Sequence, residues 1–200
     1  SEKDLGWGYW TLNVVGANTR GTKVVPLYGR LFSHAVEGHE SENVEIREAI
    51  GELKDESWEA VLDTNLGRAM RCARAVAGHF RDQRWGRIIN ISSLASKNPF
   101  AGAAAYCASK AALVMATQCL ALALAPQIRV NAIAPGFVDT HFVDWPREAM
   151  EKNIKASPMG RIPTVEDIAN AALFLASDAT GITAHTIFVD CGVTALQPVV

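Results

Sequence analysis

From residue 55 onward, segments whose apolar residues recur every three to four positions alternate with short segments that are apolar almost throughout. The first segment covers residues 58–84, and its spacing predicts a helix. Its apolar positions are Val61, Leu62, Leu66, Ala69, Met70, Ala73, Val76, Ala77 and Phe80. Asp55 or Ser57 can cap its start, and Gly86 is typical of a helix end. Residues 87–92, Arg-Ile-Ile-Asn-Ile-Ser, then predict a buried strand.

A second helix and strand follow in the same order. Residues 97–102 contain Pro and Gly and predict a loop. The Ala-rich residues 103–125 predict a long helix, and residues 128–133 predict another buried strand. The longest uncharged apolar run of that helix, residues 111–125, is too short to span a membrane and is interrupted by Thr117 and Gln118. We expect it to be buried all round, against the rest of the chain or a second subunit.

The last third of the sequence predicts a long connection, a helix and a strand. A connection as long as residues 137–163 is usually functional, often a lid with some helix of its own. Thr164 and Asp167 have the spacing of a capping box and predict the start of a helix. Residues 186–190 predict a third strand. The alternation predicts an α/β fold, with a parallel sheet and helices on both of its faces.

The first fifty residues follow neither pattern clearly. Residues 12–16, Leu-Asn-Val-Val-Gly, fit a strand that ends in a turn, whereas residues 22–53 have weak helical character and residues 37–48 are strongly acidic. The whole length of 200 residues fits one domain of ordinary size.

Composition narrows the classes of function. With 49% hydrophobic and 20% charged residues, the chain has the profile of a soluble globular protein. A net charge of −2 gives no electrostatic basis for binding nucleic acid or an anionic membrane. The chain opens on Ser-Glu-Lys-Asp with no apolar segment behind it, so we expect no signal peptide and a cytoplasmic location.

The cysteines do not indicate a metal site. Four of them are scattered through the chain, without a Cys-x-x-Cys pair or a histidine at metal-ligand spacing: Cys72, Cys107, Cys119 and Cys191. We expect buried free thiols rather than disulfides, and no bound metal.

One cluster of residues indicates proton chemistry. Tyr106 and Lys110 are four residues apart, so on a helix they lie on the same face. A free tyrosine has a pKa of about 10, and a neighbouring cation lowers that pKa toward the neutral range. Ser93, at the end of the strand 87–92, can supply a hydroxyl that hydrogen-bonds a substrate oxygen. The three residues together predict proton transfer to or from a carbonyl or an alcohol.

Several motifs, in the same order and spacing, resemble the short-chain dehydrogenase/reductase family. They are Asp63-Thr64-Asn65-Leu66, Asn90-Ile91-Ser92-Ser93, the stretch 105–112 around Tyr106 and Lys110, the stretch 129–136, and Met159-Gly160-Arg161 with residues 166–169. The similarity covers about residues 51–193 and is nearest in character to 3-oxoacyl-[acyl carrier protein] reductases and sugar-acid dehydrogenases. It implies a Rossmann-like doubly wound parallel sheet in a single domain, residues 1–200.

The resemblance also implies catalytic roles. Tyr106 would be the general acid in carbonyl reduction and the general base in alcohol oxidation. Lys110 would lower the Tyr106 pKa and bind the nicotinamide ribose, while Ser93 would orient the substrate oxygen. Asn65 would hold a water that links Lys110 to solvent.

A nicotinamide cofactor, NAD or NADP, follows from the same resemblance. Besides Tyr106 and Lys110, the residues that would line the nicotinamide come from one loop: Pro135, Gly136, Val138 and Thr140. Phe142 and Trp145, further along the connection 137–163, suggest an apolar wall for the substrate.

The chain departs from the family pattern at both ends. The glycine-rich turn that receives a pyrophosphate has no clean copy; residues 15–21 come nearest, and residues 12–16 also resemble an eroded Asn-Asn-Ala-Gly motif. We therefore expect an incomplete nucleotide-binding half within residues 1–50. Residues 183–185 and 190–192 replace family glycines, which matters wherever the backbone has a positive φ.

The sequence thus predicts an NAD(P)-dependent oxidoreductase that interconverts a secondary alcohol and a ketone. The alternative from another class is a non-catalytic relative that keeps the dimerising helices and has lost cofactor binding. A third reading is a fragment that folds poorly alone. We expect a homodimer or homotetramer, because the helices 58–84 and 103–125 resemble the family's dimer-forming pair.

Overall fold

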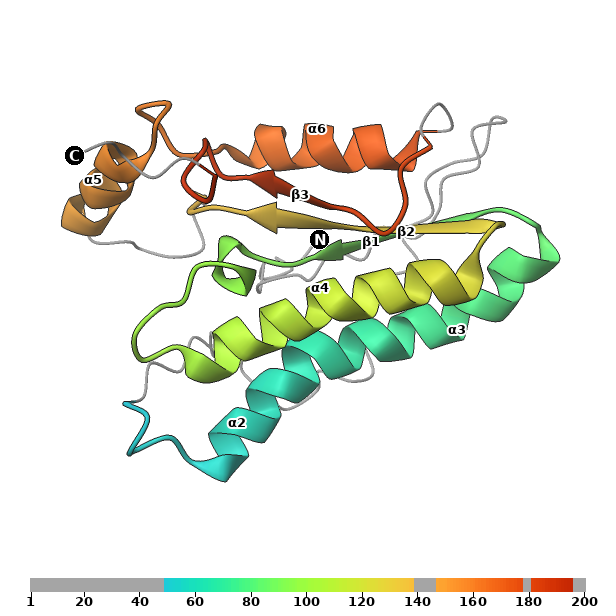
Figure 1. Ribbon diagram of the computed structural model, residues 1–200, viewed down its shortest axis with the longest axis horizontal. Coiled ribbons are helices and arrows are strands. Elements are labelled where there is room, and N and C mark those ends of the chain that lie inside the picture. Colours follow the sequence, from blue (N-terminus) through green and yellow to red (C-terminus); the bar gives the residue numbers. More distant parts are fainter. Residues whose placement is uncertain (1–48, 139–146, 178–180, 196–200) are drawn as a thin grey trace, which may run out of the picture.

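The computed structural model describes residues 49–138, 147–177 and 181–195. These residues form a three-stranded parallel sheet in the order β1-β2-β3, with helices on both faces (Figure 1). The strands are β1 (Gly86–Ile91), β2 (Ile128–Pro135) and β3 (Thr186–Val189). The predicted α/β class, the three strands and their parallel pairing are confirmed; the first forty-eight residues lie outside the described part.

The helices follow the predicted order. They are α2 (Asp55–Leu62), α3 (Arg68–Asp82), α4 (Ala104–Leu124), α5 (Arg147–Ala156) and α6 (Val165–Ala176), with a single 3-10 turn, η2 (Leu94–Ser96). The helix expected over residues 58–84 is in fact α2 and α3 joined by a π-helical turn, η1 (Asp63–Gly67). Such turns widen the helix locally and often lie at functional sites.

Neighbouring isoleucines of β1 divide the core into two layers. Ile88 packs with α3 and α4 on one face, whereas Ile89 packs with α6 on the other, because successive side chains of a strand point to opposite faces. In Figure 1, α6 lies on one side of the sheet and α3 and α4 lie on the opposite side. The sheet is therefore enclosed between two helical layers.

The end of α3 differs from the prediction. Arg84, not Gly86, takes the left-handed conformation after the helix, with a φ of 55°. Gly86 is instead the first residue of β1. A Cβ atom at Gly86 would lie 2.5 Å from the Phe80 ring, so the glycine leaves room for that core side chain.

Helix α4 is not buried all round, contrary to the expectation. Met115 and Leu122 on its outer face are 59% and 84% exposed, and 33% of its apolar window is buried. The prediction considered residues 111–125 alone; the whole of α4, with 21 residues, is by length and composition long and apolar enough to cross a membrane. A core helix meets the same criteria, and α4 packs against β2, α3 and η2.

The cysteines are free thiols, as predicted, but none of the four is buried. Cys119 on α4 is exposed and the other three are half-buried. No cluster of three or more His, Cys, Asp or Glu residues that could hold a metal is found among the described residues.

The start of α6 confirms the predicted capping box. The Asp167 amide donates to Thr164 Oγ1 at 3.1 Å, and the Thr164 amide donates to Asp167 Oδ2 at 2.9 Å. The replacement of family glycines does fall on residues with a positive φ: Ala184 and Cys191 have φ values of 61° and 54°. Both are side-chain-bearing residues in the left-handed region.

Candidate active site

Ser93 follows the carboxyl end of β1 and caps the turn η2. Its backbone is extended, with φ −161° and ψ 158°, and its Oγ accepts a hydrogen bond from the Ala95 amide at 3.1 Å. The side chain is half-buried. This bond uses a lone pair of the hydroxyl oxygen and leaves its proton available for donation to a substrate oxygen.

Tyr106 and Lys110 lie one turn apart near the start of α4, as the spacing predicts. The Lys110 ammonium is 5.7 Å from the centre of the Tyr106 ring. The same ammonium donates to the main-chain carbonyl of Ile91 at 3.1 Å. This bond brings the helix start to the strand end that carries Ser93, two residues after Ile91.

The environment of Lys110 is electrostatically simple. Burial lowers the pKa of its ammonium from 10.5 to about 8, and no neighbouring charge contributes to this shift. At neutral pH the side chain therefore still carries its positive charge. A cation held in a poorly hydrated position acts strongly on a neighbouring phenol, favouring the phenolate.

Asn65 lies in the π turn η1 and contacts α4. Its Nδ2 donates to Ser109 Oγ at 3.0 Å, and the Ser109 hydroxyl donates to the Tyr106 carbonyl at 2.7 Å. Asn65 is thus attached one residue before Lys110, and among the described residues no direct bond between Asn65 and Lys110 is found. The proton-relay role of Asn65 stays a prediction.

Ser92 was missed by the sequence reasoning. This buried side chain donates to the main-chain carbonyl of Lys110 at 3.0 Å. Asn90, which the sequence did not place in the catalytic set, donates to Thr117 Oγ1 at 2.9 Å. The strand alternation offered a signal, because residues 90 and 92 are both polar and must face the same helical layer.

The loop after β2 carries the residues expected at the nicotinamide. Pro135 ends the strand, and the Gly136 amide donates to the Val189 carbonyl at 2.9 Å. A Cβ atom on Gly136 would lie 2.9 Å from the Asp190 Cα, so the glycine allows the ends of β2 and β3 to approach closely. Val138 is described and half-buried, whereas Thr140 lies outside the described residues.

Two aromatic rings meet between loops at this end of the sheet. Phe100, before α4, and Phe137, after β2, form an edge-to-face pair with ring centres 6.0 Å apart. Both side chains are half-buried. The predicted apolar wall at Phe142 and Trp145 lies outside the described residues.

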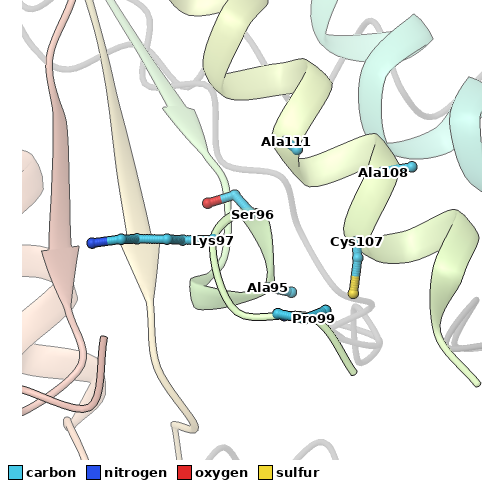
Figure 2. Close-up of a pocket in the computed structure, with 7 residues that line it drawn as sticks. All are labelled: Ala95, Ser96, Lys97, Pro99, Cys107, Ala108 and Ala111. Carbon is cyan, nitrogen blue, oxygen red and sulfur yellow. The ribbon is translucent and has the colours of Figure 1, made fainter. Parts of the chain in front are cut away.

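A separate open pocket of about 360 Å³ lies beside η2 and α4. It is lined by Ala95, Ser96, Lys97, Pro99, Cys107, Ala108 and Ala111. Figure 2 shows the Lys97 side chain extending away from Cys107 toward the strands, where its ammonium lies 5.9 Å from the centre of the Phe188 ring. Ser93, Tyr106 and Lys110 do not line this pocket.

The donor set at Lys110 fits the ribose of a dinucleotide. An ammonium has three N–H donors, and one of them is bonded to the Ile91 carbonyl. Within the described part of the chain the other two have no acceptor, and sugar hydroxyls are suitable partners. Ligands of open α/β sheets bind at the carboxyl ends of the strands, which is where Lys110 and residues 135–138 lie.

A fold of this kind, with this side-chain arrangement, is found in nicotinamide-dependent oxidoreductases, and comparison with known families agrees. The family model described as enoyl-(acyl carrier protein) reductase matches residues 37–194. The chain therefore belongs to the short-chain dehydrogenase/reductase family.

Curated relatives match over most of the chain. It is 44% identical over 150 residues to the short-chain reductase protein NovJ of Streptomyces niveus, covering 70% of this chain and 57% of that protein. It is 37% identical over 145 residues to the 3-oxoacyl-[acyl-carrier-protein] reductase FabG of Chlamydia pneumoniae, covering 71% and 58%. Galactitol 2-dehydrogenase of Agrobacterium fabrum is 42% identical over 158 residues, covering 72% and 62%. The chain thus spans less than two thirds of the length of these relatives.

Solved structures of dehydrogenases are also similar to the chain. A gluconate 5-dehydrogenase from Burkholderia cenocepacia, in complex with NADP and tartrate, superposes with a TM-score of 0.71 at 33% identity, covering 75% of this chain and 61% of that one. A 4-hydroxyisoleucine dehydrogenase complexed with NADH superposes with a TM-score of 0.72 at 29% identity, covering 76% and 65%.

Proposed function

We propose that this chain carries the catalytic centre of an NAD(P)-dependent oxidoreductase that interconverts a secondary alcohol and a ketone. The observation that supports this most is the buried Lys110 ammonium, 5.7 Å from the Tyr106 ring and bonded to the carbonyl of Ile91. This bond draws a proton-transferring pair to the strand end at which Ser93 presents its hydroxyl.

In the proposed reaction Tyr106 moves the proton. In alcohol oxidation its phenolate takes the proton of the substrate hydroxyl, and in ketone reduction its phenol returns that proton to the carbonyl oxygen. Ser93 donates a hydrogen bond to the same oxygen and so fixes the orientation of the substrate. When bound, NAD or NADP accepts or supplies the hydride.

Lys110 has two roles in this proposal. Its charge stabilises the phenolate form of Tyr106 and so lowers the pKa of that phenol. Its remaining N–H donors bind the ribose hydroxyls of the cofactor. The loop residues Pro135, Gly136, Val138 and Thr140 would hold the nicotinamide ring.

Asn65 would complete the path of the proton to solvent. The π turn supports this role, because π-helical hydrogen bonding displaces carbonyl groups from the regular helical pattern and lets them bind water. The chain of bonds from Asn65 through Ser109 to the Tyr106 carbonyl holds that turn against the catalytic helix.

The substrate we propose is a small alcohol or ketone with an apolar face. The edge-to-face pair of Phe100 and Phe137 supports this, because it places aromatic surface on the loops that follow β1 and β2.

Titration with NADH and NADPH, followed by nicotinamide fluorescence, tests the proposal directly. We expect one of the two to bind, and secondary alcohols to be oxidised by the chain with the matching oxidised cofactor. Failure of both to bind at millimolar concentration would overturn the enzyme proposal and favour the non-catalytic alternative. A Ser93→Ala variant is the matched control, because it should keep cofactor binding and lose turnover.

We also propose that the chain forms a homo-oligomer through α3 and α4. The exposed apolar side chains of Met115 and Leu122 on α4 support this, because burying them against a second copy removes apolar surface from water. Light scattering checks it, and Leu122→Glu should shift the chain toward monomer. A monomeric unmodified chain contradicts the proposal.

A further inference from the structure

Three consecutive residues at the end of β1 are each bonded to α4. The Asn90 amide donates to Thr117 Oγ1, the Ile91 carbonyl accepts from Lys110 Nζ, and Ser92 Oγ donates to the Lys110 carbonyl. We refer to these three bonds as the strand–helix clamp. Only the middle one involves a group that the proposed mechanism uses.

The Asn90–Thr117 bond lies in the fully buried layer between sheet and helix. Thr117 accepts from Asn90 and donates to the Leu113 carbonyl at 2.8 Å, so its hydroxyl is bonded on both sides. The Asn90 Oδ1 atom, in contrast, has no partner among the described residues. A buried amide with an unpaired oxygen costs stability compared with an apolar side chain of similar shape.

A buried polar pair of this kind can fix the register of helix α4 against strand β1. The buried face of α4 otherwise consists mainly of small or apolar side chains, such as Leu113 and Ala121. Apolar contacts are non-directional, so they restrain sliding or rotation of a helix less sharply than hydrogen bonds do. A buried polar pair that bonds in one alignment only is an established means of fixing register.

Lys110 is the residue that depends on that register. Ser92 holds its carbonyl and Ile91 holds its ammonium, while Thr117 is fixed two helical turns further along, at a rise of about 10 Å. A small rotation of α4 would move the ammonium away from the strand end and out of its buried position.

We propose that Asn90, Ser92 and Thr117 are positioning residues that fix α4 on β1 and thereby hold the Lys110 ammonium in its buried position at the end of the strand. This inference rests on the proposed function for its catalytic meaning, although its structural content can be measured without turnover. None of the three side chains needs to touch substrate or cofactor.

The surroundings of Lys110 determine what loosening the clamp does. Among the residues that the structure describes, the titratable group in contact with its ammonium is Tyr106 on the same helix; β1 contributes a carbonyl and the neutral side chains of Asn90 and Ser92. A displaced Lys110 gains water, which screens the effect of its charge on the phenol. The pKa of Tyr106 then rises toward the value of about 10 that a free tyrosine has.

Thr117→Val tests the proposal, with Thr117→Ser as the conservative variant that keeps the hydroxyl. In alcohol oxidation, we expect the rising limb of the pH profile of kcat/KM to move up by about half a unit or more in Thr117→Val, with a roughly three- to tenfold loss at pH 7. Thr117→Ser should restore both. Ser92→Ala should move the limb in the same direction.

A remote threonine provides the matched structural control. Thr183 Oγ1 accepts from the Val130 amide at 3.1 Å, between β2 and the segment before β3. Thr183→Val therefore removes a threonine hydroxyl that is bonded to a strand main chain away from α4, and it should lower the thermal midpoint without moving the pH profile. Equal profiles for Thr117→Val and Thr183→Val at matched loss of stability would overturn the proposal.

A measurement without substrate separates this inference from the proposed function. The chain has 3 tyrosines, so the difference between the phenolate absorbance titrations of the unmodified chain and Tyr106→Phe gives the pKa of Tyr106. We expect the same difference, taken in the Thr117→Val background, to give a higher pKa, and Thr117→Ser to give the original one. An unchanged Tyr106 pKa in folded Thr117→Val refutes the clamp, whether or not the chain turns over a substrate.

Discussion

Arg71 reaches back across the π turn to Asp63 and forms two hydrogen bonds with its carboxylate, at 2.7 Å and 2.9 Å. The hydrogen bonds from Arg71 hold the pKa of the Asp63 carboxyl below its usual value. Gly67 lies directly beneath this ion pair, where a Cβ atom would be 2.6 Å from Asp63 Oδ1. The turn that carries Asn65 is therefore bridged by a pair that a glycine at position 67 accommodates without any adjustment.

Two glycines of this helical region should respond differently to the same substitution. In Gly78→Ala the new Cβ meets nothing within 4 Å, so the gain in helix propensity should stabilise the chain by about 0.5–1 kcal/mol. In Gly67→Ala the new Cβ forces the Asp63–Arg71 pair to shift, which should cancel much of that gain. Urea unfolding of both variants measures this, and equal stabilisation would contradict the role given to the ion pair.

The start of α6 should be sensitive to acid. Hydrogen bonding to Arg161 and to the Thr164 main chain lowers the pKa of Asp167 to about 2. Because this folded-state pKa is below the unfolded value of about 3.9, the stabilisation is complete above that value and is lost as pH falls toward 2. Thermal midpoints measured from pH 6 downward should fall more steeply for the unmodified chain than for Asp167→Asn. Parallel curves would contradict this.

Removal of the Tyr106 hydroxyl should separate chemistry from binding. We expect Tyr106→Phe to lose at least about a hundredfold in kcat, the usual range for a general acid–base residue. Its thermal midpoint and its affinity for the reduced cofactor should stay close to those of the unmodified chain. Steady-state kinetics with fluorescence titration provide the check, and retained turnover would contradict the role of Tyr106.

Lys110 should be a residue that lowers stability. Burial lowers its pKa from 10.5 to about 8, so the unfolded chain holds the proton more tightly than the folded chain. That shift corresponds to about 3 kcal/mol of lost stability at neutral pH, and removing the ammonium leaves the Ile91 carbonyl unpaired at a cost of about 1 kcal/mol.

Lys110→Met should therefore be more stable than the unmodified chain by about 2 kcal/mol at pH 7, while losing activity. As pH rises from about 8 toward 10.5 the unmodified chain regains stability, so the difference should shrink. Chemical unfolding at a series of pH values measures both effects. A less stable Lys110→Met at pH 7 would contradict the cost assigned to burial.

Two residues with a left-handed backbone, Ala184 and Gly160, allow opposite substitutions to be compared. Ala184 has a φ of 61°, and its replacement by Gly should stabilise the chain by about 0.5–1 kcal/mol, because the relief of strain exceeds the added entropy of the unfolded chain. Gly160 has a φ of 65° with open space around it, so Gly160→Ala should destabilise by about 1 kcal/mol. The same sign for both variants would show that φ does not govern these sites.

The sequence predicted the elements between residues 55 and 190 well, because their apolar spacing matches the layers into which they pack. It did not predict the π turn, since residues 63–67 continue the helical pattern and the Asp63–Arg71 pair that spans the turn is not marked by that pattern. The exposed face of α4 was missed because alanine and leucine lie on all its sides and leave no polar stripe to mark the outside.

The residues of the candidate site also differ in how far the sequence predicts their arrangement. Tyr106 and Lys110 have a local spacing that a helix converts into proximity, so their relationship was predictable. For Ser92 the strand alternation indicates the face, but its partner on α4, like that of Thr117 on β1, depends on how the strand and the helix align, which no local spacing encodes. Thr140, Phe142 and Trp145 lie outside the described residues, and their assignments stay predictions.

The partner of the Lys110 ammonium is a main-chain carbonyl, which every amino acid at position 91 would supply. Random mutagenesis of that position would therefore report on packing alone and would overlook the bond. Only a backbone change, such as an ester in place of the amide that follows Ile91, would weaken the acceptor while leaving every side chain intact. Side-chain substitutions therefore cannot remove the acceptor of this hydrogen bond. Mutational scanning will assign the whole effect of the Lys110–Ile91 bond to Lys110 on α4.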